Sequence, residues 1–561
     1  MLAICARILE ATVTPKPITE NTLFYGDNLP ILREYIPTES VDLVYLDPPF
    51  NSNRSYNVLF KDETGHDSES QLVAFDDTWH WGESAEQTYQ ALVTDAPASV
   101  QTMIAALRQF IGTNQMMAYL VMMAARLVEL HRVLKPTGSL YLHCDPTASH
   151  YLRVILDAVF GSDKFRTEIA WKRSTAHSDT KQGRQQHGRI HDCLLFYTKS
   201  NSWIWNPVYL PYDKDYIDQF YSHVEEVTGR RYALDNLTAA KPGGDTLYEW
   251  HGVKPYQGRY WAYSKEKMDQ FDREGRLYYT KTGMPRYKRY LDEMPGVPLQ
   301  DIWNDIPPAL GAQDLGYPTQ KPLALLERII QASSNPGDVV LDPFCGCGTA
   351  VAAAQKLGRR WIGIDITHLS ISLQKYRLET MFPGLKFQVI GEPEDIGAAR
   401  QLAQDDRYQF QWWALSLIRA KPLGGQEGSK TGKKGSDKGV DGVITFLDDN
   451  TGKPKRVIVQ VKSGHVGAPD LVQLVGTVEQ EKAAMGVFLT LEPPTGPMET
   501  AAVRAGYYHS PGWNQDYRRV QILTIESLLK GAKVDMPPTA QTFKLAQKVE
   551  PAKPDQMALD V

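Results

Sequence analysis

The stretch DVVLDPFCGCGTAVAAAQKLGRRWIGIDI (338–366) decides the fold class of this chain. A short apolar run ends at Asp342, a Gly-rich turn follows over 343–349, and an Ala-rich helical segment closes at Gly358. A second apolar run then ends at Asp365. This order of strand, turn, helix and strand predicts an α/β unit with a parallel sheet. Glycines allow the turn to approach a ligand at the open end of the helix, and the second carboxylate suits ribose hydroxyls, so we expect an adenosine-containing ligand.

A similar strand pattern lies far upstream, where VDLVYL (41–46) runs into Asp47-Pro48-Pro49-Phe50. Prolines stop the strand, so an acid and rigid backbone carbonyls are expected at its carboxyl end. A helical pattern follows over about 100–134, and the apolar run SLYLHC (139–144) predicts another strand. Both halves therefore predict the same α/β architecture.

The middle of the chain, residues 161–300, has a different composition. It carries 22 Lys and Arg against 18 Asp and Glu, although the whole chain has a net charge of −5. Aromatic residues are frequent there, and they include Trp171, Trp203, Trp205, Trp250 and Trp261. Rings interleaved with cations suit base stacking and phosphate contact, but the same rings would equally form the core of an irregular domain. The sequence leaves these two interpretations open and predicts a separate insertion.

A Gly/Lys/Ser-rich linker at 421–439 leads to a third unit. Strands over 440–447 and 456–462, joined by DDNTGK, predict a hairpin. Alternation along the second strand places Gln460 and Lys462 on one face, where Asp441 of the partner strand could join them. A carboxylate on Mg²⁺ and an ammonium near a scissile phosphate would suit phosphodiester hydrolysis, with Asp441 as the metal ligand.

Composition excludes several classes of protein. A chain of 561 residues with 42% hydrophobic and 23% charged residues predicts several globular domains rather than a disordered or membrane-embedded protein. The opening MLAICARILE is too short and too soon polar for a signal peptide, so we expect a cytoplasmic protein. The five cysteines form no C-x2-C pair, which favours buried thiols over disulfides or structural zinc. The P-loop pattern G-x-x-x-x-G-K-[ST] is missing from the sequence, so we expect any ATP-driven motor to be a separate subunit.

The segment LDPFCGCGT, followed by the acid at a strand end, resembles the cofactor site of amino-methylating DNA methyltransferases. The resemblance covers about residues 20–390. It implies binding of S-adenosyl-L-methionine, with the methionine end near Asp342, Phe344, Gly346 and Gly348 and the ribose near Asp365. LFYGDN and YPTQKP resemble two further cofactor segments of that family, and they imply roles for Asp27, near the adenine ring, and for Thr319 and Lys321.

LDPPF (46–50) resembles the catalytic loop of the same family, and HDCLLFYTKS (191–200) resembles a segment near its target base. An exocyclic amine is a poor nucleophile because its lone pair is delocalised into the ring. The resemblance implies that Asp47 and the Pro48 carbonyl accept the amine protons, that Pro49 stiffens the loop, and that Phe50 stacks on a base flipped from double-stranded DNA. Asp in the first position favours adenine N6, and N4-cytosine methylation is the alternative.

The order of these segments resembles the circularly permuted β group of the family. The expected fold is an α/β, Rossmann-like methyltransferase sheet with an inserted target-recognition region and a restriction-endonuclease-like domain. The expected domains are a catalytic half (1–160), the target-recognition insertion (161–300), a cofactor half (301–395), a helix and linker (396–439), the endonuclease-like domain (440–535) and a tail (536–561).

The third unit resembles the Mrr-like branch of the PD-(D/E)-x-K nucleases, in G-x-D-G, Q-x-K and GVFLT (486–490). This resemblance implies magnesium-dependent cleavage, within a prokaryotic restriction-modification or phage-defence system acting at the nucleoid. A homodimer and a separate restriction or motor subunit are the expected partners, with no membrane. A nuclease or DNA-binding subunit whose methyltransferase fold serves recognition alone is the other alternative.

Overall fold

The computed structural model describes residues 18–49, 81–174, 185, 187–241, 246–309, 320–423, 439–448 and 454–538, and the backbone of an antiparallel pair, β3 (Ser55–Lys61) and β4 (Asp67–Asp76). Phe50 and Thr319 lie outside the described residues. The chain forms two compact units, one of residues 1–206 with 301–561 and one of Pro207–Gln300. Among the described residues, no helix is both long and apolar enough to cross a bilayer.

A nine-stranded sheet organises the first unit, in the order β16-β6-β7-β5-β2-β17-β18-β1-β19. Strand β7 runs antiparallel to β5 and β6, whereas the other neighbours are parallel. The strands are β1 (Thr22–Tyr25), β2 (Val41–Leu46), β5 (Leu134–Cys144), β6 (Phe165–Lys172), β7 (His191–Thr198), β16 (Ile302–Trp303), β17 (Val339–Asp342), β18 (Arg360–Asp365) and β19 (Gln388–Ile390).

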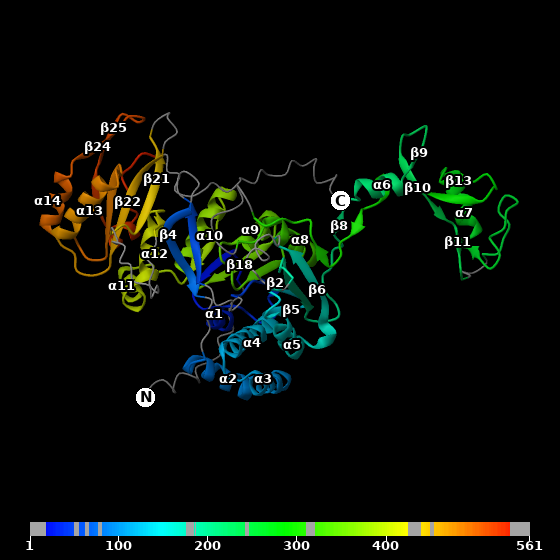
Figure 1. Cartoon of the computed structure of the whole chain (residues 1–561), viewed down its shortest axis with the longest axis horizontal. Helices are drawn as coiled ribbons and strands as arrows, with labels where there is room; N and C mark the ends of the chain where they lie inside the picture. The colour runs from blue at the N-terminus through cyan, green and yellow to red at the C-terminus, as the bar shows by residue number, and fades with distance from the viewer. Residues whose placement is uncertain are drawn as a thin grey trace. The chain divides into compact units, whose positions relative to one another are not determined.

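Helices cover both faces of this sheet (Figure 1). One layer contains α1 (Asn28–Tyr35), α4 (Gln115–Val133) and α5 (Ser149–Phe160), with α2 (Glu83–Asp95) and α3 (Ala98–Ile111) packed against it. The other layer contains α8 (Leu323–Ser333), α9 (Thr349–Lys356) and α10 (His368–Met381). Every residue of β2 is buried, as expected for a central strand covered on both faces.

The second unit contains the sheet β13-β14-β10-β9. Its strands are β9 (His223–Val224), β10 (Arg231–Asn236), β13 (Leu277–Tyr279) and β14 (Pro285–Tyr290), with the small pairs β8 (Tyr209–Leu210) and β15 (Val297–Pro298), and β11 (Thr238–Ala239) and β12 (Tyr260–Trp261). Its helices are α6 (Lys214–Phe220) and α7 (Lys265–Arg273), and the turn η3 is Leu291–Glu293. Trp250 and Trp261 are fully buried in its core.

One expectation for the middle segment needs correction, and one open question about its tryptophans is answered. The insertion was expected to begin at 161, but β6 and β7 belong to the nine-stranded sheet, so the separate unit begins at Pro207. Trp171 likewise lies buried beside that sheet, with its indole N–H donating to the Ile306 carbonyl at 3.0 Å. Of the five tryptophans, Trp171, Trp250 and Trp261 are core residues, whereas Trp205 is 49% exposed.

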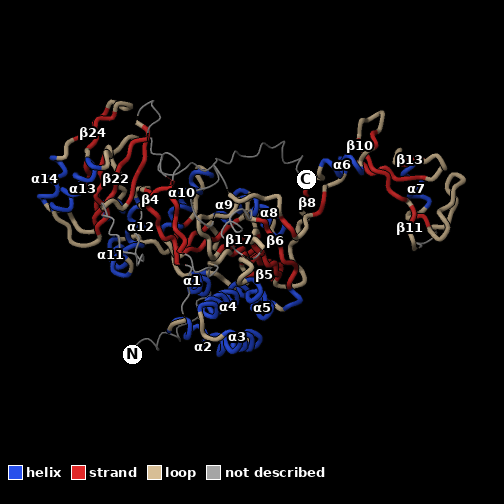
Figure 2. Tube along the Cα trace, viewed as in Figure 1, coloured by secondary structure: helices blue, strands red, loops and turns tan. Residues whose placement is uncertain are grey.

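The C-terminal region of the first unit has its own five-stranded sheet, β20-β21-β22-β23-β26, drawn as red strands in Figure 2. The strands are β20 (Lys421–Pro422), β21 (Gly442–Leu447), β22 (Pro454–Lys462), β23 (Met485–Thr490) and β26 (Val520–Thr524), with a separate pair β24 (Tyr507–Ser510) and β25 (Gln515–Arg518). The helices are α11 (Ile396–Asp405), α12 (Arg407–Leu417), α13 (Ala468–Gln480), α14 (Gly496–Arg504) and α15 (Ile525–Leu529). The predicted hairpin is present, with Gly442 opposite Val459.

Candidate functional site

The two motifs at the centre of the sequence interpretation lie at neighbouring strand ends. Strands β2 and β17 are parallel and pair Leu43 with Val340 and Val44 with Leu341. Parallel neighbours end at the same edge of a sheet, so Asp47 and Asp342 both follow their strands into one crevice. A cavity of about 230 Å³ opens there. It is lined by Asp27, Asp47, Pro48, Pro49, Lys321, Asp342, Phe344, Gly346 and Asp365 among others.

The turn after β17 has the backbone geometry that its glycines permit. Gly346 and Gly348 have φ values of +52° and +76°. A Cβ on Gly348 would lie 2.8 Å from Cγ of Gln374, so a larger residue would strain the backbone and displace a neighbour. Gly348 is the N-cap of α9, and it supports the turn rather than lining the cavity. Backbone therefore approaches the cavity at the N-terminus of a helix.

The Asp365 side chain, at the end of β18, forms a hydrogen bond with this turn. One carboxylate oxygen accepts the Gly346 N–H at 2.8 Å, and the other accepts the N–H and hydroxyl of Thr367 at 2.9 and 3.1 Å. Burial raises the pKa of Asp365 although these hydrogen bonds lower it. Carboxylate oxygens have about four acceptor sites between them, so Asp365 retains capacity for ribose hydroxyls.

Asp342 is almost fully buried at the floor of the crevice. Its carboxylate accepts the Phe344 N–H at 3.0 Å. Burial raises the pKa of Asp342 well above its usual value, and the charges of Asp47 and Asp365 raise it further. Such a group gains from a cationic partner, which suits the positively charged methionine end expected of the cofactor.

Sequence reasoning missed a pair of residues beside Asp27. Asp27 caps α1 by accepting the Leu29 N–H at 2.9 Å, and it forms an ion pair with Arg126 at 2.7 Å. Asn28 accepts from Arg126 at 2.5 Å and donates to the Pro343 carbonyl at 2.7 Å. Asn28 thus joins the segment after β1 to the turn after β17, and Arg126 holds Asp27 and Asn28 against α4. The sequence feature that could have indicated Arg126 is its position as a charged residue within the apolar part of α4.

Asp47 does not face the cavity alone, because the Lys321 ammonium forms an ion pair with its carboxylate. The two side chains are 16% and 11% exposed. Behind Asp47, the Tyr45 hydroxyl lies 2.9 Å from Nδ1 of His143, and Nε2 of His143 lies 3.1 Å from Asp192.

These groups behind Asp47 are buried and come from β2, β5 and β7. Burial opposes ionisation of Asp192, but the hydrogen bond and charge of His143, together with Lys321 and Arg173, lower the pKa of this carboxyl. The segment HDCLLFYTKS therefore contributes an anion to the surroundings of the catalytic-loop candidate.

The cysteines of the described residues take no part in bonding to one another. Cys144, Cys193, Cys345 and Cys347 are buried free thiols, as expected. Burial raises the pKa of Cys345 well above its usual value, so this thiol stays protonated beside the cavity. Burial also raises the pKa of Cys347, so among the described residues both cysteines that line the cavity are thiols rather than thiolates at neutral pH.

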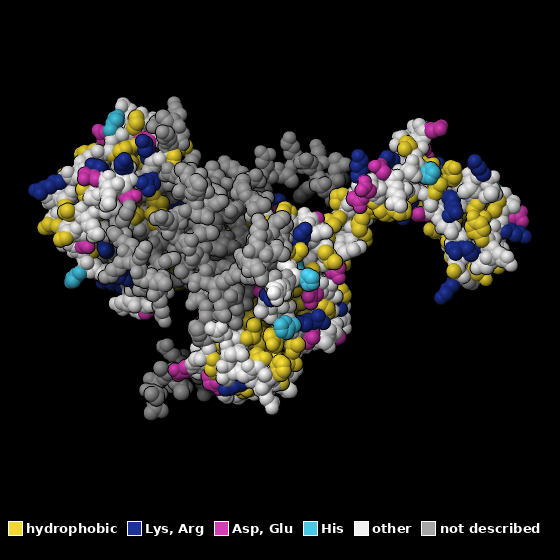
Figure 3. All heavy atoms as spheres, viewed as in Figure 1, with side chains coloured by type: hydrophobic (Ala, Val, Ile, Leu, Met, Phe, Trp, Pro, Cys, Tyr) yellow, Lys and Arg dark blue, Asp and Glu magenta, His cyan; other side chains and the backbone are white. Residues whose placement is uncertain are grey.

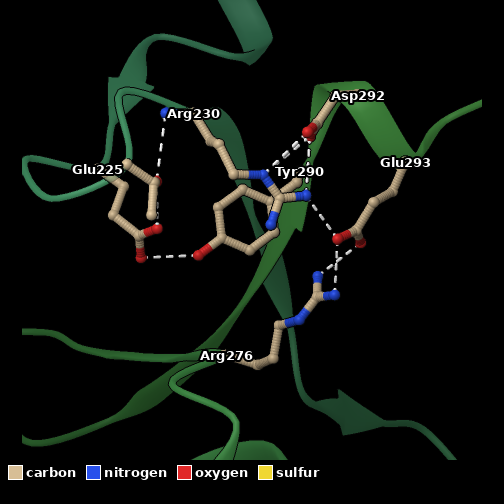
Figure 4. Close-up of polar contacts among 7 residues, drawn as sticks. Glu225, Arg230, Arg276, Tyr290, Asp292 and Glu293 are labelled. Carbon is tan, nitrogen blue, oxygen red and sulfur yellow. Dashed lines mark hydrogen bonds and ion pairs between the residues drawn. The ribbon is translucent and has the colours of Figure 1, made fainter.

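The second unit presents a mixed surface of Lys, Arg and hydrophobic side chains (Figure 3). Several of its cations are already paired. Arg230 binds Asp292 and Glu293, and Arg276 binds both oxygens of Glu293 at 2.6 and 2.7 Å (Figure 4). The Tyr290 ring lies 3.8 Å from the Arg230 guanidinium and 4.8 Å from that of Arg276. This cluster stabilises the sheet of the unit more than it offers charge to a ligand.

The C-terminal candidate site is only partly assembled. Asp441 precedes β21 and lies opposite Gln460 by register, with its N–H donating to Val459. Its carboxylate accepts the Val461 N–H at 2.6 Å. Gln460 is 2% exposed, and its Oε1 has no hydrogen-bond partner among the described residues. Within the described part of the chain, no group of three or more His, Cys, Asp or Glu is placed to hold a metal ion.

Family models match two regions of the chain. A family model described as DNA methylase, named for N6 and N4 methyltransferases, matches residues 41–373. A model described as NACHT-associated inactive Restriction Endonuclease 1 matches residues 425–530.

Curated relatives include type II methyltransferase M.EcaI of Enterobacter cloacae, 29% identical over 62% of this chain and 67% of that protein. The StyLTI Mod subunit of a type III restriction-modification enzyme from Salmonella typhimurium is 25% identical over 62% of this chain and 51% of that protein. DNA adenine methyltransferase YhdJ of Escherichia coli is 24% identical over 64% of this chain and 82% of that protein. The solved M1.HpyAVI–SAM complex matches 64% of this chain and 98% of that chain at 16% identity, with a TM-score of 0.30.

Proposed function

Because the chain belongs to the DNA methylase family of N6 and N4 enzymes, we propose that it transfers a methyl group from S-adenosyl-L-methionine to the exocyclic N6 of adenine in double-stranded DNA. The observation that carries this proposal is the shared crevice of Asp47-Pro48-Pro49 and the turn after Asp342. The cofactor, when bound, supplies the electrophilic methyl group. The chain supplies the acceptors and the shape of the site.

Asp47 has the central role in this proposal. A flipped adenine would present its amine to the Asp47 carboxylate and the Pro48 carbonyl, which accept its two hydrogens and localise the nitrogen lone pair. The following Pro49 fixes the direction of these acceptors, since its ring restricts the backbone. Asp365 would hold the ribose hydroxyls, and Asp342 and Gly346 would surround the methionine end. Phe50 would stack on the base, and Thr319 would contact the cofactor.

We further infer that the sheet is circularly permuted. The strand that ends in the catalytic-loop candidate, β2, precedes the cofactor strands β17 and β18 along the chain, yet it lies next to β17 in the sheet. The unit of residues 207–300, inserted between the two halves, would recognise the target sequence. Exposed lysines there, including Lys241, Lys254 and Lys281, suit contact with phosphates.

Mass spectrometry of nucleosides tests the reaction and its base. DNA is incubated with the protein and S-adenosyl-L-methionine, digested to nucleosides and analysed for N6-methyladenosine and N4-methylcytidine in their deoxy forms. N6-methyladenine is the expected product. A cytosine product would end the adenine assignment while keeping the family, and the lack of either product would overturn methyl transfer.

The C-terminal domain has two candidate functions. The sequence predicts magnesium-dependent cleavage, with Asp441 holding Mg²⁺ and Lys462 near the scissile phosphate. One observation favours a domain that does not cut DNA, because the matching family model is described as inactive. A nicking assay with Mg²⁺ separates the two functions.

The proposed setting is a restriction-modification or phage-defence system in a prokaryotic cytoplasm, close to the nucleoid. Double-stranded DNA is the proposed macromolecular ligand. One relative is named as a Mod subunit of a restriction-modification enzyme, which supports a separate restriction or motor subunit as a partner. A homodimer stays a prediction of the sequence, which light scattering of the purified protein tests.

A further inference from the structure

Lys321 occupies the acceptor that methyl transfer requires. Its ammonium forms an ion pair with Asp47, and it also acts on the pKa of Asp342 and Asp192. Of these three carboxylates, Asp47 is the one that Lys321 contacts directly. The Lys321 ammonium therefore occupies one of the acceptor positions that a target amine would use on the Asp47 carboxylate.

The relative strength of the two donors decides which one Asp47 binds. An ammonium–carboxylate hydrogen bond is roughly twice as strong as one between neutral groups, and the target amine is neutral. The amine alone is therefore a poor competitor for Asp47 in this half-buried position. An anion that offers Lys321 a new ion pair would release Asp47 at little cost, since one ion pair replaces another.

The chain allows this exchange without moving its backbone. Lys321 is followed by Pro322, the N-cap of α8, and α8 packs through Leu325, Leu326 and Ile329, which are fully buried. The position of the backbone is thus fixed at the edge of the cavity. The lysine stem has four methylene groups and several rotamers, so the ammonium can change partners within the same cavity.

We propose that Lys321 is a positioning residue. Its ammonium stays paired with Asp47 until the carboxylate of the cofactor's methionine end replaces Asp47 as its ion-pair partner. The inference rests on the proposed methyl transfer, since it assigns the trigger to that cofactor. The trigger has the right chemistry, because the methionine end carries a carboxylate and Lys321 lines the cavity together with Gly346 and Asp342. Base engagement is then conditional on the cofactor, which prevents a flipped base from occupying an unloaded enzyme.

Fluorescence of 2-aminopurine tests the inference without methyl transfer. The methylated position is first mapped with the parent protein, and an oligonucleotide with 2-aminopurine at that position then reports the flipped base. The parent should show little fluorescence increase alone or with 5′-methylthioadenosine, which lacks the carboxylate. With S-adenosylhomocysteine, which retains the carboxylate, the fluorescence should increase by about tenfold, because more of the target base is then flipped.

Lys321→Met keeps most of the stem and removes the charge, so its fluorescence should rise without any ligand. Lys356→Met is the matched control. Lys356 forms an ion pair with Glu327 of α8 at 2.7 Å and lies away from the cavity, so this variant should show the same fluorescence as the parent. A ligand-independent signal in the parent, or continued dependence on S-adenosylhomocysteine in Lys321→Met, would overturn the inference. A parent that methylates no DNA would instead overturn the proposed function.

Discussion

The crevice between β2 and β17 and the hairpin of β21 and β22 both have aspartates at strand ends, but their carboxylates have different surroundings. Asp47 and Asp342 lie at the carboxyl ends of parallel strands and line a cavity. Asp441 lies at the start of an antiparallel strand, where its carboxylate accepts a backbone N–H of the partner strand. The two motifs thus differ in whether their acids line a cavity. In the hairpin the same type of residue completes the backbone hydrogen bonding.

The largest effect is expected from removing the acceptor in the crevice. Asp47→Ala should lower the rate of methyl transfer by about 10²–10³-fold, comparable to the loss of one preorganised hydrogen-bonding group from an active site. Cofactor binding should be retained, since Asp342 and Asp365 remain, and it should tighten if Lys321 no longer has to leave Asp47. Asp441→Ala is the matched control and should methylate at the parental rate. Transfer of a labelled methyl group and calorimetric titration of the cofactor measure the two quantities, and equal rates for parent and Asp47→Ala would remove the catalytic role.

A smaller effect is expected in the pH dependence of stability. Burial raises the pKa of Asp342 above its unfolded value, so its contribution to the free energy of unfolding is fully present below the unfolded pKa near 3.8 and is lost as the pH rises through the folded pKa. Asp342→Asn should remove this loss, and the variant should gain stability relative to the parent as the pH rises. Urea unfolding between pH 4 and 8 measures the difference.

Glu225 of the second unit provides a control of opposite sign. Hydrogen bonds from Thr228, Tyr290 and Lys288 lower the pKa of Glu225 to about 2. Its contribution is present above the unfolded pKa and is lost as the pH falls, so Glu225→Gln should reduce stability at neutral pH and lose that difference in acid. The difference in stability between variant and parent should change with pH in opposite directions for Asp342→Asn and Glu225→Gln. If both differences change in the same direction, burial in the crevice and hydrogen bonding in the surface cluster do not shift the two pKa values in opposite directions.

The smallest effect is expected at the hairpin. Because the described residues place no group of three or more metal-ligating side chains there and the matching family model is described as inactive, nicking of supercoiled DNA with Mg²⁺ should be equal for the parent and Lys462→Ala. Agarose electrophoresis of the plasmid forms measures this. If the parent nicks the plasmid and Lys462→Ala does not, the cleavage activity predicted from Q-x-K is supported. The hairpin would then be a catalytic site, as is proposed for the crevice.

Much of the crevice was predictable because its residues follow strand ends. Apolar runs that stop at Asp47, Asp342 and Asp365 indicate parallel strands, and such strands end at a common edge. Arg126 and Lys321 differ in this respect. Arg126 is one cation in a long apolar helix, and its contacts with Asp27 and Asn28 join segments about a hundred residues apart. The resemblance gave Lys321 a cofactor role, but its ion pair with Asp47 depends on where α8 begins relative to β2.

The boundary of the insertion could not be placed from composition. Basic and aromatic residues are frequent from 161 onward, but β6 and β7 pair with each other and with β5, so they complete the large sheet. Hydrogen bonding between strands is a long-range property, and composition does not report it. The same limitation applied to the tryptophans, whose burial depends on neighbours that come together only on folding.

The sequence by itself determined the α/β class, the residues that meet at the strand ends, and the family to which residues 41–373 belong. These properties follow from local patterns, because hydrophobic periodicity, glycine turns and strand-ending prolines act over a few residues. Tertiary structure alone decided that Lys321 holds Asp47, that Arg126 braces Asp27, and that Asp441 binds the backbone of its partner strand. Each of those contacts joins side chains across elements, so its existence depends on packing geometry rather than on the residues nearby in the chain.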